Sequence, residues 1–244
     1  MKKISFIVLG MVLIGLSSCY KKDNYDAPNA GVHGNVIDSY TGKPLLASQN
    51  DWQIRIWERS WTAGTVNNQT IPIKQDGSYN NSKLFAGTYD MLPYGGPFWP
   101  ITDTVKNVVL GGGKSGTQDF TVTPYLQLID FETSLQGTNL TLKVRLKAPI
   151  RAGLPNLVDV KPFLSLTNFV GESNYINIPE YNDTRIQLNK SWIDAYGDVE
   201  SSPLLTIGPL PVKSGYTYNV RVGANVNDAN RKYNYSEIKQ VIVP

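Results

Sequence analysis

The chain has 244 residues, with 23 basic side chains, 20 acidic side chains, one cysteine and one histidine. This length fits one large domain or two ordinary ones. Two of the lysines lie at the extreme N-terminus, and without them 21 basic residues face 20 acidic ones. The body of the chain is therefore close to neutral and lacks the basic footprint that nucleic-acid binding requires.

An apolar segment, residues 4–16, follows these two lysines, and two serines then precede the single cysteine, Cys19. A positive start, a short apolar run and small residues are typical of a secretory signal, and the run is shorter than the roughly 20 residues that cross a bilayer. The end of the segment resembles the bacterial lipobox, in which cleavage occurs before a cysteine that carries a lipid. We therefore predict a signal peptide over residues 1–18 and lipidation of Cys19, with cleavage before a free cysteine as the alternative.

The next residues, 19–29, are polar and charged without periodicity, which predicts a solvated tether. Beyond them the pattern is β. Trp52 shares parity with two isoleucines in a stretch that alternates with polar residues, so we predict a strand with Trp52 in the core. Asp76 and Gly77 predict a tight hairpin turn. No segment shows helical periodicity over three turns.

Four short motifs carry a resemblance in this half of the chain: Gly34–Asp38, Thr41–Leu45, Asp76–Tyr79 and Leu84–Tyr89. Together they resemble the carboxypeptidase-regulatory-like, transthyretin-like (prealbumin-like) β-sandwich over residues 30–123. The resemblance implies a non-catalytic spacer or assembly module.

Pro124 is the predicted boundary of a second domain, residues 124–244. The stretch Leu140–Leu146 alternates cleanly between apolar and polar residues, which predicts a half-buried strand. Residues 186–196 are compatible with a short helical turn around Trp192. The stretch 205–222 resembles the corner of an immunoglobulin-like or fibronectin type III-like sandwich, where a buried tyrosine, here Tyr218, bonds back to the backbone. The predicted fold is all-β, with two β-sandwiches in series.

Few residues suit catalysis. His33 has no free cysteine and no G-x-S-x-G motif to act with, and a single histidine rules out His-based zinc motifs. The acid pairs Asp130 with Glu132 and Asp51 with Glu58 are candidates for glycosidase chemistry, but we interpret them as surface charges. We predict no enzyme activity, no cofactor and no bound metal.

Aromatic residues are the main candidates for binding. Three tryptophans fall within ten residues, including Trp57 and Trp61, and Tyr94, Phe98 and Trp99 form an aromatic loop. Such rings stack on sugars or anchor partner proteins. Packing inside the sandwiches is the alternative for each of them.

The order of Cys19, a polar tether and the first module resembles the Bacteroidetes lipoproteins of the DUF3823 family. The resemblance implies a lipid-anchored protein of the outer membrane that faces the cell surface, with the periplasmic face as the alternative. It also implies an accessory role beside a glycan-uptake system of the SusC and SusD type, through glycan binding or complex assembly. The alternative is a structural spacer or protein-interaction module with no glycan affinity. Asp103-Thr104-Val105 resembles a Bacteroidetes O-glycosylation pattern, which makes Thr104 a candidate acceptor.

Overall fold

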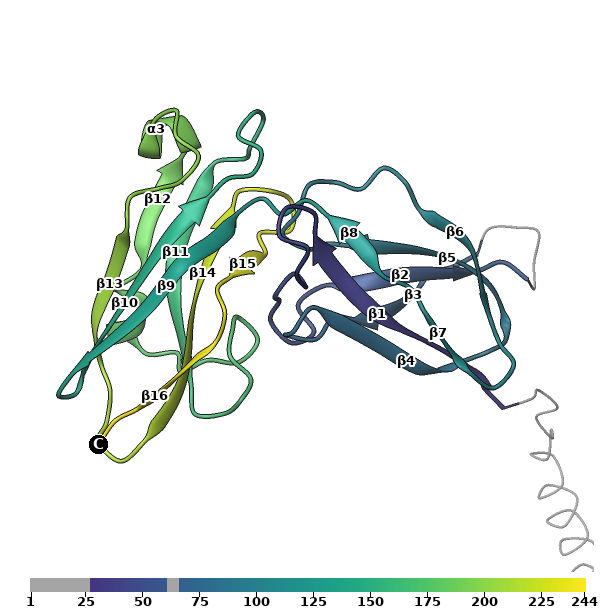
Figure 1. Ribbon diagram of the computed structural model, residues 1–244, viewed down its shortest axis with the longest axis horizontal. Coiled ribbons are helices and arrows are strands. Elements are labelled where there is room, and N and C mark those ends of the chain that lie inside the picture. The colour runs from purple at the N-terminus through teal and green to yellow at the C-terminus, as the bar shows by residue number, and fades with distance from the viewer. Residues whose placement is uncertain (1–26, 61–65) are drawn as a thin grey trace, which may run out of the picture.

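The computed structural model describes residues 27–60 and 66–244, and regular structure in this part of the chain is almost entirely β (Figure 1). Two β-sandwiches lie side by side along the long axis of the molecule. The all-β prediction with two sandwiches is therefore confirmed. The predicted signal peptide, Cys19 and Trp61 lie outside the described residues.

The first sandwich packs a sheet of order β4-β1-β7, in which β8 also pairs with β1, against a sheet of order β3-β2-β5-β6. Its strands are β1 (Ala30–Asp38), β2 (Gln53–Glu58), β3 (Gln69–Pro72), β4 (Ser78–Leu84), β5 (Gly87–Tyr94), β6 (Val105–Leu110), β7 (Ser115–Thr117) and β8 (Phe120–Val122). β1 runs from the far end of this sandwich toward the second one, and it pairs in parallel with both β7 and β8.

Alternation along β2 builds the core of the first sandwich. Trp52, which precedes the strand, is 3% exposed, and Ile54 and Ile56 on the same parity are buried as well, so the prediction for Trp52 is confirmed. The predicted hairpin at Gly77 is wrong in one respect: the tight turn is present, with a φ of 80°, but β3 pairs with β2 while β4 pairs with β1. The turn therefore carries the chain from one sheet to the other.

The second sandwich packs a sheet of order β13-β10-β9 against one of order β12-β11-β14-β15, in which β16 also pairs with β14. Its elements are β9 (Gln127–Gln136), β10 (Asn139–Lys147), β11 (Leu157–Ser165), α2 (Pro179–Asn182), β12 (Ile186–Lys190), α3 (Trp192–Tyr196), β13 (Leu205–Pro211), β14 (Thr217–Val226), β15 (Tyr233–Tyr235) and β16 (Lys239–Ile242). The stretch around Trp192 is thus a strand followed by one short helix.

Sequence patterns explain these elements. In β10 the even positions from Leu140 to Leu146 are fully buried, as the alternation predicts. Helix α3 begins after Ser191, whose hydroxyl accepts a hydrogen bond from the Asp194 N–H at 3.1 Å. The Tyr218 hydroxyl accepts a hydrogen bond from the Lys213 N–H at 3.1 Å, which is the geometry of a tyrosine corner.

Candidate functional site

The aromatic loop between β5 and β6 connects the two sandwiches. Phe98 is 5% exposed and meets Trp52 edge to face, with ring centroids 5.3 Å apart, inside the first core. The next residue, Trp99, packs against the second core, where its ring lies 5.4 Å from that of Tyr125. The expectation that Phe98 contacts a ligand is therefore wrong, because its ring fills a core. The Trp99 side chain is partly buried and also packs against a core, so little of its ring is available to a ligand.

A buried arginine extends this connection, which we call the joint. Arg221 on β14 is fully buried; its Nη2 donates to the Ala47 carbonyl of the first sandwich at 2.7 Å, and its guanidinium lies 3.7 Å over the Tyr235 ring. Burial lowers the pKa of Arg221 to about 10. Lys232 adds an ion pair with Asp51 across the joint at 2.9 Å. These bonds hold the sandwiches in one relative orientation.

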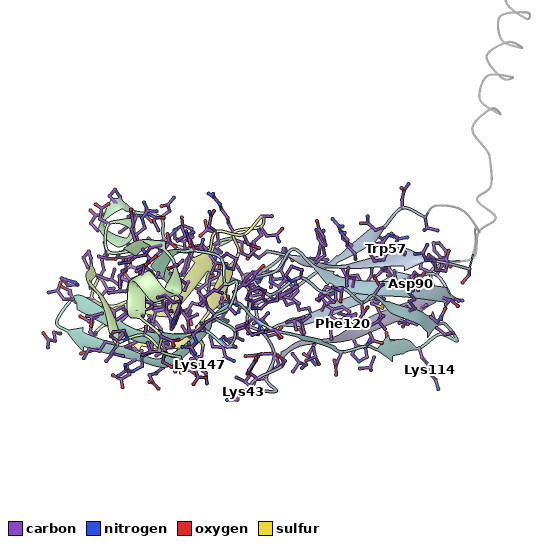
Figure 2. All side chains as sticks on the ribbon, turned by 90° about the horizontal axis from the view of Figure 1, so that it is seen from above. Lys43, Trp57, Asp90, Lys114, Phe120 and Lys147 are labelled. Atoms are coloured by element: carbon purple, nitrogen blue, oxygen red, sulfur yellow. The ribbon has the colours of Figure 1, made fainter. Side chains whose placement is uncertain are left out.

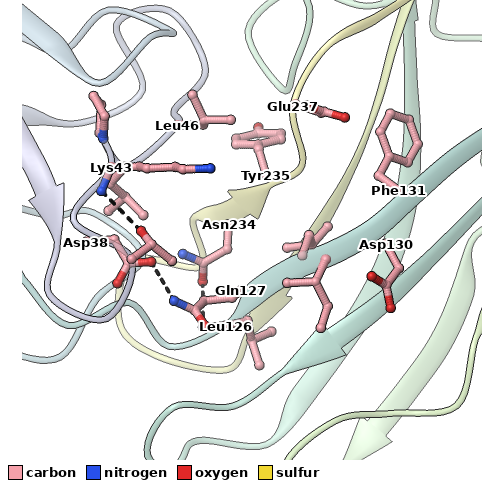
Figure 3. Close-up of a pocket in the computed structure, with 15 residues that line it drawn as sticks. Asp38, Lys43, Leu46, Leu126, Gln127, Asp130, Phe131, Asn234, Tyr235 and Glu237 are labelled. Atoms are coloured by element: carbon pink, nitrogen blue, oxygen red, sulfur yellow. Dashed lines mark hydrogen bonds between the residues drawn. The ribbon is translucent and has the colours of Figure 1, made fainter.

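A cleft of about 410 Å³ opens at the joint (Figure 3). Its buried polar groups are already engaged: Gln127 donates to Asp38 at 2.6 Å, and Asn234 accepts from the Leu126 N–H at 3.1 Å and donates to the Pro97 carbonyl at 3.0 Å. A ligand would have to break these bonds to use them. The cleft is therefore better explained as part of the joint than as a binding site.

The surface that remains for the predicted aromatic residues is the outer face of the sheet β3-β2-β5-β6. Trp57 pairs with Asp90 across β2 and β5, and Tyr94 pairs with Gln53, so all four side chains point away from the core. Four residues separate the two aromatic positions along the strands, which is about 13 Å at the usual rise per residue. We call this surface the outer sheet face (Figure 2 labels Trp57 and Asp90).

Charged groups accompany the rings on the outer sheet face. Arg59 pairs with Asp90 at 2.9 Å, and Asp90 also accepts from the Asn107 N–H at 3.2 Å. The Arg55 guanidinium lies 3.2 Å over the ring of Tyr94, which stays 41% exposed. Trp57 is partly buried. The face thus combines two ring surfaces with hydrogen-bond donors and acceptors in fixed positions.

The structure separates the residues that were candidates for catalysis. His33 lies on β1, where its Nε2 is 3.1 Å from the Thr117 hydroxyl. A bulge with Asp130 at φ 53° places that carboxylate 3.2 Å from Arg145, while Glu132 continues the strand as an exposed residue.

The second acid pair is also engaged. The interpretation of Asp51 as a surface charge is wrong, because its side chain is 7% exposed in the ion pair at the joint. Glu58 accepts from the Ser60 N–H at 2.6 Å. Within residues 27–60 and 66–244 no group of three or more His, Cys, Asp or Glu side chains could hold a metal ion. In the same ranges no helix is long and apolar enough to cross a membrane. Thr104 lies in the loop before β6 and is partly buried.

Sequence reasoning missed Arg221. The sequence feature that could have indicated its burial is the alternation along β14. There Tyr218, Val220 and Val222 fill the second core, while Arg221 points the other way. A charged residue inside an otherwise buried strand indicates that both faces of the strand are covered. The run of alternating valines alone does not show what covers the second face.

Comparisons with known proteins agree with the two-sandwich division. The model described as the DUF3823 N-terminal domain matches residues 30–123, and the model described as DUF3823_C, a domain of unknown function, matches residues 126–240. No protein with a curated description shows significant similarity to the chain.

Several solved structures share the whole fold. A DUF3823 family protein from Bacteroides uniformis has a TM-score of 0.70 at 23% identity, over 89% of this chain and 100% of its own. A second Bacteroides uniformis protein, described as "putative carbohydrate binding", has a TM-score of 0.68 at 23% identity, over 88% of this chain and 99% of its own. A Parabacteroides merdae member of the family has a TM-score of 0.65 at 20% identity, over 88% and 100%.

Proposed function

From the premise that this chain belongs to the DUF3823 family, we propose that it is a non-catalytic, glycan-binding surface lipoprotein. The observation that carries the proposal is that the outer sheet face presents two aromatic residues, Trp57 and Tyr94, on one side of a rigid sheet. Aromatic rings stack on the apolar faces of sugars, and neighbouring polar groups bind the hydroxyls. The description of one structural relative as "putative carbohydrate binding" supports the same proposal.

The polar groups of the outer sheet face suit sugar hydroxyls. Asp90 is only 9% exposed and uses one oxygen for Arg59 and the other for a backbone N–H. It therefore holds the Arg59 side chain, which is 44% exposed, in place as a donor for a ligand. Arg55 and Gln53 lie on the same face, beside Tyr94. Because Arg59 is held by Asp90 and Arg55 by the Tyr94 ring before a ligand arrives, binding costs little ordering of these two side chains.

A non-catalytic role is supported by the way the acidic residues are used. Asp51 forms an ion pair with Lys232. The three carboxylates that line the cleft at the joint, Asp38, Asp130 and Glu237, are engaged by Gln127, Arg145 and Lys239 respectively. Glycoside hydrolysis needs two carboxyl groups on opposite sides of a bound sugar. The protein therefore contributes binding rather than bond cleavage.

The location follows from the lipobox pattern. We propose that Cys19 carries a lipid in the outer membrane and that the body faces the cell surface, beside SusC-like and SusD-like glycan-uptake proteins. The start of β1 at the far end of the first sandwich supports an arrangement in which the second sandwich points away from the membrane. A Cys19→Ala variant is expected to leave the membrane fraction, and protease added to intact cells is expected to digest the wild-type protein. Protection from protease would contradict surface exposure.

Glycan binding is tested on the soluble protein that begins after Cys19, by affinity electrophoresis on a panel of polysaccharides and then by calorimetry on the best binder. The variant with both Trp57→Ala and Tyr94→Ala is expected to weaken affinity at least tenfold. Tyr216→Ala is the matched control, because this tyrosine is 48% exposed and lies at the end of the second sandwich. Unchanged affinity in the double variant would contradict the role of the outer sheet face.

A structural spacer that holds another protein at the cell surface is the second candidate function. The joint favours it, because the bonds of Arg221 and Asp51 fix the sandwiches in one orientation. Co-purification with a SusC-like or SusD-like partner, without affinity for any polysaccharide of the panel, would support the spacer and contradict glycan binding.

A further inference from the structure

A second hollow, of about 770 Å³, lies beside the joint and is lined by both sandwiches. We call it the amide pocket. Its described lining residues are Gln49, Asn50, Leu166, Thr167, Asn168, Phe169, Ser173 and Asn174. None of these eight side chains carries a charge, and the volume lies within the range of small-molecule sites.

The loop that forms one wall is held by hydrogen bonds to its backbone. The carbonyls of three consecutive residues, 167–169, accept from Asn219 at 2.8 Å, from Gln75 at 2.8 Å and from the Asn174 amide. Such bonds fix the loop before any ligand arrives, so little ordering cost remains for binding.

Three side chains of this loop, those of Leu166, Asn168 and Phe169, are left free for contact, whereas the Thr167 hydroxyl donates to the Phe169 carbonyl. Leu166 and Phe169 are each 50% exposed, although their backbone is fixed. The amide of Asn168 makes no side-chain hydrogen bond within the described part of the protein. The Asn174 amide nitrogen lies within hydrogen-bond distance of the Ser165 and Thr167 hydroxyls and of the Phe169 carbonyl, which leaves its own oxygen available as an acceptor.

The opposite wall belongs to the first sandwich and is tied to the loop. The hydroxyls of Ser48 and Ser173 lie 2.6 Å apart, and Gln75 accepts from the Val170 N–H at 3.3 Å. Asn50 adopts a left-handed backbone with φ 60°, and its N–H donates to the Ile73 carbonyl at 2.9 Å. The pocket therefore exists only when both sandwiches are in their observed orientation.

We infer that the amide pocket binds an uncharged oligosaccharide. The ring of Phe169 provides a stacking surface, and the amides of Asn50, Asn168 and Asn174 provide donors and acceptors for hydroxyl groups. A polyanionic glycan would find no cation in the lining, and an apolar peptide would leave the amides unpaired at a cost in binding free energy. The inference rests on the proposed glycan binding, but it places a second binding site beside the joint, separate from the outer sheet face.

The test compares two variants, Phe169→Ala and Asn168→Asp, with Tyr40→Ala as the matched control, because Tyr40 is 54% exposed and lies outside the pocket. Each is titrated calorimetrically with the neutral polysaccharide that the wild type binds best, and with polygalacturonate as a charged comparison. We expect each pocket variant to weaken binding of the neutral polysaccharide about tenfold or more. Tyr40→Ala should bind like the wild type, and polygalacturonate should bind more weakly than the neutral polymer. Thermal unfolding checks that the exposed substitutions leave the fold intact.

The outcomes separate the two sites. If Phe169→Ala binds normally while the double variant of Trp57 and Tyr94 does not, the amide pocket is contradicted and the outer sheet face stands. If Phe169→Ala weakens binding while the double variant binds like the wild type, the outer sheet face is contradicted and the amide pocket stands. Preference for polygalacturonate would contradict the uncharged ligand class, and failure of the wild type to bind any polysaccharide would contradict both proposals.

Discussion

The joint and the outer sheet face use the same residue types for different purposes. At the joint, Arg221 lies 3.7 Å over the Tyr235 ring and is fully buried, with a hydrogen bond to the other sandwich. On the outer sheet face, Arg55 lies 3.2 Å over the ring of Tyr94, which is 41% exposed. An arginine stacked on an aromatic ring therefore does not identify a binding site. What distinguishes the two regions is whether a second part of the protein covers the ring.

The largest expected effect contrasts two aromatic residues four positions apart, Tyr94 at the end of β5 and Phe98 in the loop that follows. Phe98→Ala should lower the free energy of unfolding by about 3–5 kcal/mol, because it empties a volume in the first core. Tyr94→Ala should cost about 1 kcal/mol or less, since it removes a partly exposed stacking contact. Urea denaturation measures both, and similar losses in the two variants would contradict the division into core and surface.

Arg221 tests the joint itself. Arg221→Ala should lower the free energy of unfolding by about 2–4 kcal/mol, because a cavity replaces a fully buried side chain. Arg221→Met should fall within about 1 kcal/mol of the wild type, since the Nε and Nη1 atoms have no hydrogen-bond partner in the described structure and apolar replacement of a poorly paired buried charge is often tolerated.

Arg55→Met on the outer sheet face is the control for this pair. It should lower the free energy of unfolding by about 1 kcal/mol or less, because it removes only a partly exposed contact with the Tyr94 ring. Equal destabilisation by Arg221→Met and Arg221→Ala would show that the guanidinium bond to Ala47, rather than the volume of the side chain, holds the joint.

The corner of the second sandwich should give a smaller effect. Tyr218→Phe removes the acceptor of the Lys213 N–H and should lower the free energy of unfolding by about 1 kcal/mol. Tyr216→Phe, at a tyrosine that is 48% exposed, should leave stability unchanged. If Tyr218→Phe left the free energy of unfolding unchanged, water would have to replace the hydroxyl as the acceptor at this corner.

The smallest expected effect concerns pH. Burial raises the pKa of Asp159, although Tyr233 donates to its carboxylate at 3.0 Å and Arg185 lies nearby. A carboxyl whose pKa is raised on folding favours the folded state when protonated, so this contribution to stability is lost as the pH rises through the folded-state pKa. Asp159→Asn should flatten the stability profile in that acidic window. An unchanged profile from urea denaturation at several pH values would contradict this assignment.

The fold was largely predictable from the sequence because local patterns decide it. Alternation placed Trp52 and the even residues of β10 in their cores, and the turn at Gly77 lies where its sequence indicates. The pairing of the strands on either side of that turn was not predictable, since a turn motif fixes the bend but not the sheet that each strand joins.

The candidate sites were predictable only in part. Trp57 and Tyr94 lie on one surface, but Phe98 fills a core, because parity cannot be read in a loop rich in glycine and proline. The amide pocket was missed, since Asn50 and Asn168 are far apart in sequence and meet only through the joint. Polar loop residues of this kind carry no periodic signal before the tertiary structure is known.

The adjacent rings of Phe98 and Trp99 enter different cores. This has a consequence for whether the two domains can be exchanged independently during evolution. A recombination event that replaced the second sandwich with an unrelated one would leave the Trp99 ring without the core that covers it, and replacement of the first sandwich would leave the second core without that ring. The two halves should therefore evolve as a matched pair rather than as interchangeable modules. Expressed alone, residues 30–123 would expose an indole that is normally covered, and residues 124–244 would lack it.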